Sequence, residues 1–413
     1  MAGNINRKMI IFFISTSAVG FCLYIGCFSY YLIKTGTNPL IVSSLIGSTA
    51  LTSLFWGPVA GKIIDGTNYK FSFLAAAQII CGLCVFGFGM LDDFNYLLTP
   101  FLVITFSLCL NLALIVVNQY LIPNLSDDYE IAITTTSKLT GGIVFLSGIF
   151  LAYFYNKINT SSILVISSAA YFISAIACIH FISRTKNLYE PNLNNPPASN
   201  SGRNIRIIYK ESLDLICKNW FLALSICIFA FTETSFLTNF DVIAFSLGAT
   251  PYAFVFLMGA ISGMIDSIAS WLYPKLLQNR TLNFKWCFFL SISFLIYSLS
   301  ALLAFNGFDK KNLWFIPILV ITLDFIGVWW SIFSSANVRE ASYQGSYGQT
   351  MAAFRVPRSL VTFLGVTSIG TALQTGNLWF ILAFDLLLII MLMVFYKRFS
   401  LNKIYRTTDF NNV

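Results

Sequence analysis

The sequence predicts an all-α polytopic membrane protein with twelve transmembrane helices in two six-helix bundles. Two observations carry this prediction. Of the 413 residues, 57% are hydrophobic and only 10% are charged, against about 25% charged in an average soluble chain. The apolar residues also gather in blocks of 20 or more, which is the length a helix needs to cross a bilayer. This composition excludes soluble enzymes, nucleic-acid binders and secreted disulfide scaffolds.

Twelve apolar blocks follow one another along the chain. They lie near residues 9–33, 39–61, 71–90, 97–121, 131–155, 161–183, 220–246, 251–272, 286–306, 313–336, 350–373 and 377–397. The period-two alternation of an outer-membrane barrel is missing, so each block is predicted to be a helix. The first block has no Ala-x-Ala cleavage site, which is typical of a retained span and not of a signal peptide.

A polar linker divides the blocks into six plus six. The run from Glu190 to Gly202 is rich in Pro, Asn and Ser, the composition of a poorly ordered linker. From Ile205 to Lys218, apolar and charged residues are interleaved, as in a short amphipathic helix on a membrane surface. We therefore expect an N-terminal six-helix bundle over 1–183, a cytoplasmic linker with this helix over 184–219, and a C-terminal six-helix bundle over 220–413.

The basic residues predict the orientation. The lysines placed on one side are Lys34, Lys157, Lys310 and Lys311, and the remaining 21 of the 25 lysines and arginines are placed with the termini and the linker. Such an excess of positive charge marks the cytoplasmic side of a membrane protein. We expect a multi-pass protein of the cytoplasmic (inner) membrane of a bacterium, with both termini in the cytoplasm and no basic residue inside a span.

The two halves repeat weakly, at an offset of 213 residues. The stretch Gly61–Asp65 after the second block aligns with Pro274–Gln278 after the eighth, and the same offset carries Asn111 onto Asp324. A repeat of six helices around a site at the membrane midplane is the plan of alternating-access transporters.

The loop after the second block resembles a motif of the major facilitator superfamily. Gly61, Asp65 and Lys70 match the pattern G-x-x-x-D-R-x-G-R-R, whose other fixed positions are occupied here by Gly66, Asn68 and Tyr69. In that family the loop's aspartate contacts the start of helix eleven and holds the cytoplasmic side closed. The resemblance therefore implies a conformational gate made of Gly57, Pro58, Gly61, Asp65 and Lys70.

Within the superfamily, the whole chain looks most like the macrolide-efflux and enterobactin-exporter branch. The resemblance is carried by Tyr31–Gly36, by Gly57-Pro58 and by Asn118–Pro123, which ends helix four before an acidic loop. The chain departs from the family pattern in two respects. Phe106 and Ser107 stand where many proton antiporters carry an arginine, and the Gly-Pro signature of exporter helix five is reduced to Gly141, Gly142 and Gly148 without proline.

Acidic residues inside the predicted spans are the candidates for chemistry, because a charge at the bilayer centre costs ~2.5–3.5 kcal/mol on insertion scales. They are Glu233, Asp241, Asp266, Asp324 and Asp385. A carboxylate buried without a cation favours its protonated form, as a proton carrier requires. The family fold implies that helices seven and ten line the cavity, so Glu233 and Asp324 are expected to couple protons. The alternative is that they only bond a neighbouring helix.

The other three acidic residues of the predicted spans are not expected to carry protons. Asp241 is expected near the outer mouth, and Asp266 and Asp385 are expected in structural contacts. The polar residues expected to line the substrate cavity are Tyr24, Asn111, Asn118 and Asn239. Asn118 can equally stabilise the end of helix four. The 16% aromatic content suits a cavity for bulky amphipathic molecules, although lipid-facing phenylalanines would give the same content.

These observations and the family resemblance together predict secondary-active efflux. We expect export of an amphipathic organic molecule (a siderophore, macrolide-like drug or peptide antibiotic) in exchange for protons. Alternatives are a proton-coupled importer of a nutrient or siderophore and, outside transport, a membrane receptor or scaffold. No nucleophile–base pair, metal cluster or phosphate-binding G-x-x-x-x-G-K-[ST] loop is visible. We therefore expect neither an enzyme nor a cofactor, metal or nucleic-acid partner, but a monomer that handles a small molecule and protons within a lipid bilayer.

Overall fold

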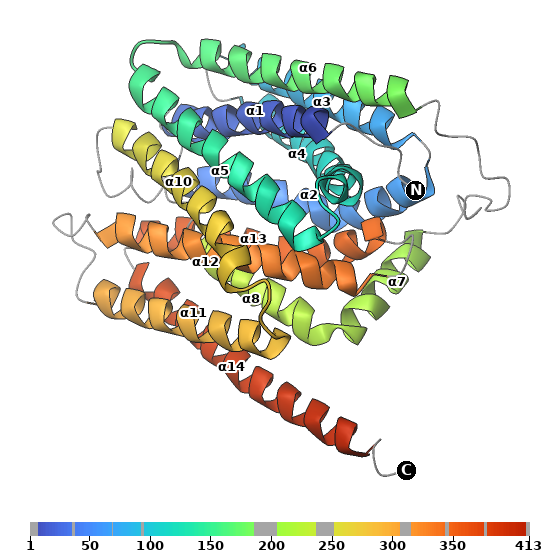
Figure 1. The fold of residues 1–413 in the computed structure, drawn as a ribbon. Coiled ribbons are helices and arrows are strands. Elements are labelled where there is room, and N and C mark those ends of the chain that lie inside the picture. Colours follow the sequence, from blue (N-terminus) through green and yellow to red (C-terminus); the bar gives the residue numbers. More distant parts are fainter. Residues whose placement is uncertain are drawn as a thin grey trace.

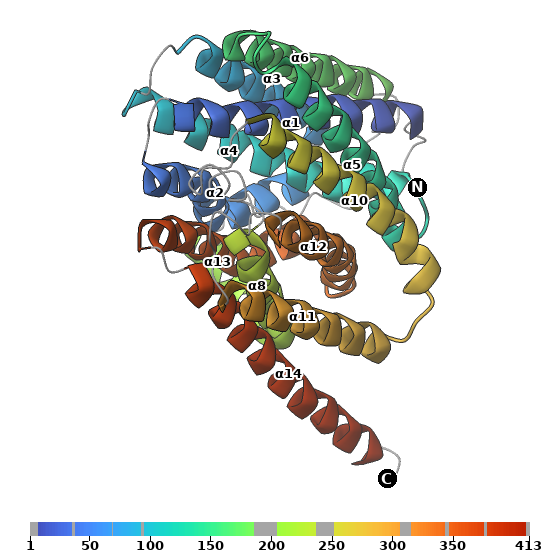
Figure 2. The ribbon, with the colours of Figure 1, turned by 90° about the vertical axis from the view of Figure 1, so that its left-hand side faces the viewer.

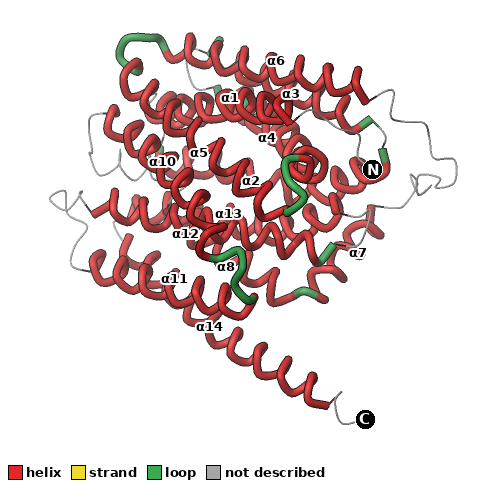
Figure 3. The backbone as a smooth tube through the Cα atoms, viewed as in Figure 1, coloured by secondary structure: helices red, strands yellow, loops and turns green. Residues whose placement is uncertain are grey.

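In the part of the chain that its computed structural model describes, the regular elements are helices joined by loops and turns, and this part contains no strand (Figure 3). The described residues are 7–34, 38–67, 69–91, 95–185, 205–236, 252–305, 315–342, 347–375 and 378–409. Among them, nine helices are long and apolar enough to cross a membrane, and one bent pair could make a tenth. The chain is a multi-pass membrane protein, as predicted.

The first six long helices pack together as the upper layer of Figure 1. They are α1 (Arg7–Lys34), α2 (Pro39–Gly66), α3 (Lys70–Gly89), α4 (Leu98–Val116), α5 (Tyr129–Phe154) and α6 (Thr160–Thr185). After α4 the chain continues through a π-helical turn, Val117–Leu121, and a 3₁₀ turn, Ile122–Asn124. Asp128 then starts α5 by accepting hydrogen bonds from the backbone nitrogens of its first turn, as a helix N-cap does.

The helices after the linker are α7 (Ile205–Lys218), α8 (Trp220–Phe236), α10 (Tyr252–Leu276), α11 (Leu282–Phe305), α12 (Phe315–Glu340), α13 (Tyr347–Thr375) and α14 (Leu378–Asp409). Of these helices, α10 lies along α5, and the others form the lower layer of Figure 1. A bend of 93° separates α7 from α8. We call the end of the structure at which α6 ends and α7 lies the linker side (Figure 1).

Two seams join the two halves of the chain, one where α2 runs along α13 and one where α5 runs along α10 (Figures 1 and 2). Glycines allow the helices of the second seam to touch. A Cβ atom on Gly148 would lie 2.6 Å from the backbone nitrogen of Ala260, and one on Gly263 would lie 2.6 Å from the carbonyl oxygen of Gly141. Small residues permit such close approach of membrane helices, so the seam depends on them.

Many aromatic side chains pack inside the layers. In the lower layer, Trp330 stacks on Phe229 with ring centroids 4.0 Å apart. In the upper layer, Tyr24 packs against Phe106 at 4.4 Å and is only 3% exposed. Tyr24 is thus buried in aromatic packing and is not among the residues that line the cavity described below, so its contact with a substrate stays a prediction. Because α1 is apolar on every face, the sequence could not show that this face turns toward α3 and α4.

Candidate functional site

A cavity of about 220 Å³ lies between the two layers, in the linker-side half of the structure. Its polar lining consists of Asn118, Thr136, Ser137, Ser331, Ser334, Ser335, Arg355 and Arg358. The remaining lining residues are apolar, and Phe354 is the aromatic one among them. This lining does not match the expected aromatic cavity for bulky molecules, because the aromatic rings described above are used in helix packing.

Two arginines of α13 supply the charge of this cavity. Arg355 and Arg358 are three residues apart and therefore share one face of the helix. Arg358 follows Tyr347 by 11 residues, which places it about 16 Å along α13. The charge count predicted both arginines outside the spans, and the structure places them within the long helix α13. Ionisable residues of membrane helices face the bundle interior or a cavity, and both arginines line one.

Three carboxylates from three helices of the second half of the chain come together. Glu233 of α8, Asp266 of α10 and Asp324 of α12 interact electrostatically with one another. The hydroxyl of Ser262 donates a hydrogen bond to Asp324. The structure thus brings the two predicted proton-coupling residues together. It adds Asp266, for which the sequence indicated only a structural contact, because adjacency between distant helices leaves no local pattern.

Glu233 differs from the other two acids because it has a cation nearby. Its carboxylate interacts electrostatically with Arg358 of α13. Gly327 of α12 leaves room for it, since a Cβ atom there would lie 3.5 Å from the Glu233 carboxylate carbon. The expectation that the intramembrane acids have no cation is therefore wrong for Glu233, and Arg358 connects this acid to the cavity.

The internal repeat gives the acid pair a counterpart in the first half. The offset of 213 residues that carries Asn111 onto Asp324 also carries Ser53 onto Asp266. Ser53 and Asn111 are hydrogen-bonded to each other between α2 and α4. An amide and a hydroxyl can bond without changing charge, whereas two carboxylates can do so only when one holds a proton. The second half thus carries two ionisable groups at the positions that correspond to this bonded pair.

The other predicted site residues have separate places. Asn118 lines the cavity, although its side-chain nitrogen already donates to the carbonyl oxygen of Leu114 at 2.8 Å. The bond to Leu114 holds the Asn118 side chain at the end of α4, and its contact with a substrate stays a prediction. Asp385 is fully buried in α14 and interacts electrostatically with Tyr297 of α11. Asn239 and Asp241 lie outside the described residues.

Asp65, at the end of α2, caps the start of α13. Its carboxylate accepts hydrogen bonds from the backbone nitrogens of Gly348 at 3.2 Å and Gln349 at 2.8 Å. The side chain of Gln119 also donates to it. These bonds satisfy amide groups that have no partner within α13. The contact between this aspartate and helix eleven, which the resemblance implied, is present in the structure.

The other residues of the expected gate differ in how tightly they are packed. A Cβ atom on Gly61 would lie 2.6 Å from the carbonyl oxygen of Gly348, while one on Gly57 would have its nearest neighbour at 3.8 Å. Pro58 lies inside α2 between these glycines. Lys70 contacts the hydroxyl of Tyr120, and its amino group lies 3.8 Å from the centre of that ring.

A second linker-side contact was not predicted. Lys285 of α11 forms an ion pair with Glu130 of α5 at 2.8 Å, and both side chains are mostly buried. Beside it, the side chain of Gln278 donates to Asp128, the cap of α5, at 2.6 Å. The repeat offset carries Asp65 onto Gln278, so each half sends one residue to the start of a helix in the other. Extending the repeat to these positions could have indicated the contact.

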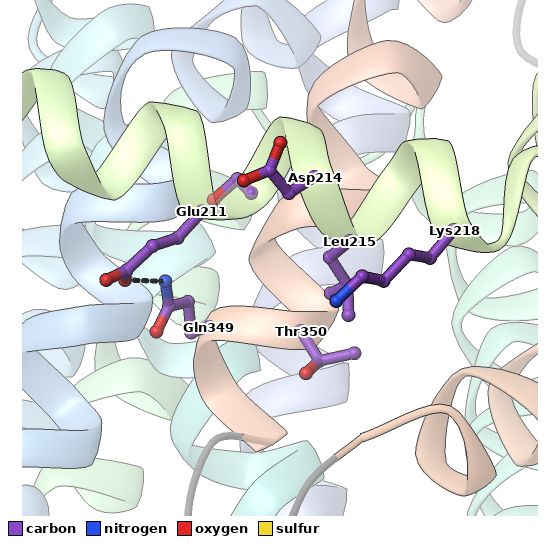
Figure 4. Close-up of a pocket in the computed structure, with 7 residues that line it drawn as sticks. Glu211, Asp214, Leu215, Lys218, Gln349 and Thr350 are labelled. Carbon is purple, nitrogen blue, oxygen red and sulfur yellow. Dashed lines mark hydrogen bonds between the residues drawn. The ribbon is translucent and has the colours of Figure 1, made fainter.

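Helix α7 borders a hollow on the linker side, shown in Figure 4. This hollow measures about 390 Å³ and is lined by Glu211, Ser212, Asp214, Leu215, Lys218, Gln349 and Thr350. The side chain of Gln349 donates to Glu211 at 2.9 Å. On its other flank, the hydroxyl of Tyr209 donates to the carbonyl oxygen of Phe55 in α2. Helix α7 is therefore bonded to both layers.

Comparison with known proteins identifies the fold. No sequence-family profile matches the chain, and no curated protein sequence matches it. Among solved structures, the nucleoside transporter NupG covers 94% of this chain and 99% of its own, with 13% identity and a TM-score of 0.68. A bacterial homologue of the iron transporter ferroportin, in its outward-facing state, covers 95% and 99%, with 14% identity and a TM-score of 0.69.

A third similar structure is that of the POT family transporter PepTSo. It covers 96% of this chain and 99% of its own, with 10% identity and a TM-score of 0.66. The fold is that of major facilitator transporters. At these identities the likeness concerns the fold alone, so the cargo and its coupling must be argued from the site.

Proposed function

We propose that the protein is a secondary-active transporter that exports an amphipathic organic small molecule in exchange for protons. The observation that carries this proposal is the group of Glu233, Asp266 and Asp324 beside a cavity between the two layers. Ionisable residues buried in membrane helices mark ion and substrate pathways. The similar structures are transporters of nucleosides, iron and peptides, which supports transport as the general activity.

In this proposal the layers move as two bundles, 1–183 and 220–413, and 184–219 connects them on the cytoplasmic side. The glycine-lined seams provide the surfaces along which the bundles rock. Asp65 and the Glu130–Lys285 pair hold the linker side closed. The protein works as a monomer in the cytoplasmic membrane of a bacterium, with both termini in the cytoplasm.

Glu233 is the proposed proton carrier, and Asp324 with Asp266 the supporting pair. When Glu233 is charged, Arg358 attracts it and stabilises the charged form. When Glu233 takes up a proton this attraction is lost, and Arg358 becomes available to the cavity. A change of protonation at Glu233 thus changes the charge presented inside the cavity.

The position of Arg358 also favours a second candidate function, proton-coupled import. A substrate anion that binds Arg358 would compete with Glu233, so Glu233 would take up a proton as the substrate binds. Protons and substrate would then move together, which is symport. A substrate cation attracted by the carboxylates would instead displace the proton, which is antiport. The sign of the proton change on substrate binding separates these functions.

The test uses accumulation of candidate substrates in deletion and complemented cells, with and without a proton uncoupler. Export predicts lower accumulation in the complemented cells, and import predicts higher accumulation. Glu233→Gln keeps the shape of the protonated acid, so binding should survive while proton-driven transport is lost. Asp324→Asn is the companion variant, and if it alone abolishes coupling, Glu233 is the wrong acid. If both variants still transport against a gradient, proton coupling should be abandoned.

A further inference from the structure

We infer that the cavity lined by Arg355 and Arg358 binds the anionic group of the transported molecule, which makes the substrate a small organic acid with an apolar part. This inference rests on the proposed transport function and names the class of its substrate. Because an anion at Arg358 would lead Glu233 to take up a proton, as argued above, an anionic substrate favours the symport candidate over antiport.

The charge of the lining carries the inference. Two of the fourteen lining residues are arginines, and none is a carboxylate. More than a third of the Arg358 side chain is exposed, although the residue lies well inside α13. Guanidinium groups present a fork of donors that matches carboxylates and phosphates in two-point contacts. An anion entering the cavity would meet two of them.

The rest of the lining fits a molecule with one polar end. Helix α12 adds the hydroxyls of Ser331, Ser334 and Ser335, whose spacing places the first on the same face as the other two. Such hydroxyls can donate to an anion. The apolar lining residues are Ile122, Ile133, Ile226, Val338, Met351 and Phe354. A charged group at the arginines would thus leave its carbon skeleton against aliphatic side chains.

The volume limits the size of the molecule. The cavity measures about 220 Å³, whereas sites for drug-sized ligands run to roughly 300–1,000 Å³. In this conformation the site therefore suits a small acid and not a macrolide-sized compound. The hollow beside α7 has more room, but its lining mixes Glu211, Asp214 and Lys218 and so does not favour an anion.

Binding of matched probes to the purified full-length protein tests this inference. The anionic probes are 4-phenylbutyrate and 2-phenylethylphosphonate, and the neutral control is 4-phenylbutyramide, which has the carbon skeleton of the first. Isothermal titration calorimetry should show that at least one anion binds about tenfold or more tightly than the amide. Arg355→Gln and Arg358→Gln should each weaken anion binding by about tenfold or more and leave amide binding unchanged.

Two further variants keep the test decisive. Lys138→Gln removes one positive charge from α5 outside the cavity lining and should leave anion binding unchanged. Arg358→Lys keeps the charge but lacks the fork, so it should fold like the wild type and retain part of the affinity. Equal binding of anion and amide would overturn the inference, as would equal losses in Lys138→Gln and Arg358→Gln, or no anion binding at about 10 mM.

This measurement is separate from the test of transport. The titration needs no membrane gradient, so anion binding without proton-driven transport would refute the proposed function and leave the anion site standing. Proton-driven transport of a molecule that carries no negative charge would refute the anion site and leave the proposed function standing.

Discussion

The carboxylate of Asp65 accepts a 2.8 Å hydrogen bond from the backbone nitrogen of Gln349. The side chain of the same glutamine donates to Glu211 of α7 at 2.9 Å. One residue at the start of α13 is therefore held by α2 and by α7 at once. Because α2 and α13 form one of the seams between the layers, this bonding joins three helices on the linker side.

Replacing Asp65 should loosen the linker side. Asp65→Asn removes the negative charge at the start of α13 and turns an amide toward backbone donors, at a cost of about 0.3–2 kcal/mol. We expect normal expression, slower transport and higher reactivity of cysteine probes placed on the linker side. Asp127→Asn is the control, because Asp127 is an exposed acid before α5. Unchanged probe reactivity in Asp65→Asn would show that the cap does not hold this side closed.

The glycines of α2 should respond differently to the same change. Gly61→Ala places a methyl group 2.6 Å from the carbonyl oxygen of Gly348, so α2 and α13 must move apart. Gly57→Ala has its nearest contact at 3.8 Å and should be tolerated. Overpacking of this kind typically costs about 1–3 kcal/mol. Thermal unfolding in detergent and transport rate should both fall in the Gly61 variant alone, and equal losses in the two variants would contradict this packing.

Breaking the ion pair between Glu130 and Lys285 should destabilise the structure more than removing both charges. Glu130→Gln or Lys285→Met leaves one charge buried without its ionic partner, at a cost of up to ~3–5 kcal/mol. The double variant removes both charges and should recover much of that loss. A double-mutant cycle on the midpoint of thermal unfolding measures the coupling. Strictly additive effects of the two changes would mean that the pair contributes no interaction energy.

The bond from Glu211 should hold α7 against α13. Glu211→Ala removes the acceptor of Gln349, whereas Glu211→Gln keeps a carbonyl oxygen that can replace it. Limited trypsin digestion reports the difference, because α7 carries Arg206, Lys210 and Lys218. We expect faster cleavage within α7 in the alanine variant and wild-type rates in the glutamine variant. Equally slow cleavage in both would show that α7 is held by its other contacts.

Much of the fold follows from the sequence because its signals are local. Long apolar blocks predict the helices one by one, and interleaved charges between Ile205 and Lys218 predict the short helix α7. The contact of Asp65 with α13 follows from its resemblance to a known motif. Each of these predictions depends only on residues that are neighbours in the sequence or on a known motif.

The site is less predictable because it depends on which helix faces turn inward. Glu233 and Asp324 could be selected as rare intramembrane acids, yet their neighbour Asp266 and the cation Arg358 are fixed by contacts between distant helices. Arg355 and Arg358 were placed outside the membrane because a count of charges assumes that basic residues lie in loops. The packing of Tyr24 could not be predicted for the same reason, since an evenly apolar helix does not reveal which of its faces turns inward.

The contacts of α7 determine which of the two layers it leaves when the layers separate. Burial raises the pKa of the Tyr209 hydroxyl, so this residue donates to α2 throughout the neutral pH range. The hydroxyl of Tyr209 bonds to the uncharged carbonyl oxygen of Phe55, whereas the side chain of Gln349 bonds to the charged carboxylate of Glu211. Hydrogen bonds to charged groups contribute ~1.5–3 kcal/mol against ~0.5–1.5 kcal/mol for neutral ones. If the linker side opens, the contact of Tyr209 with α2 should therefore break first, and α7 should move together with the lower layer.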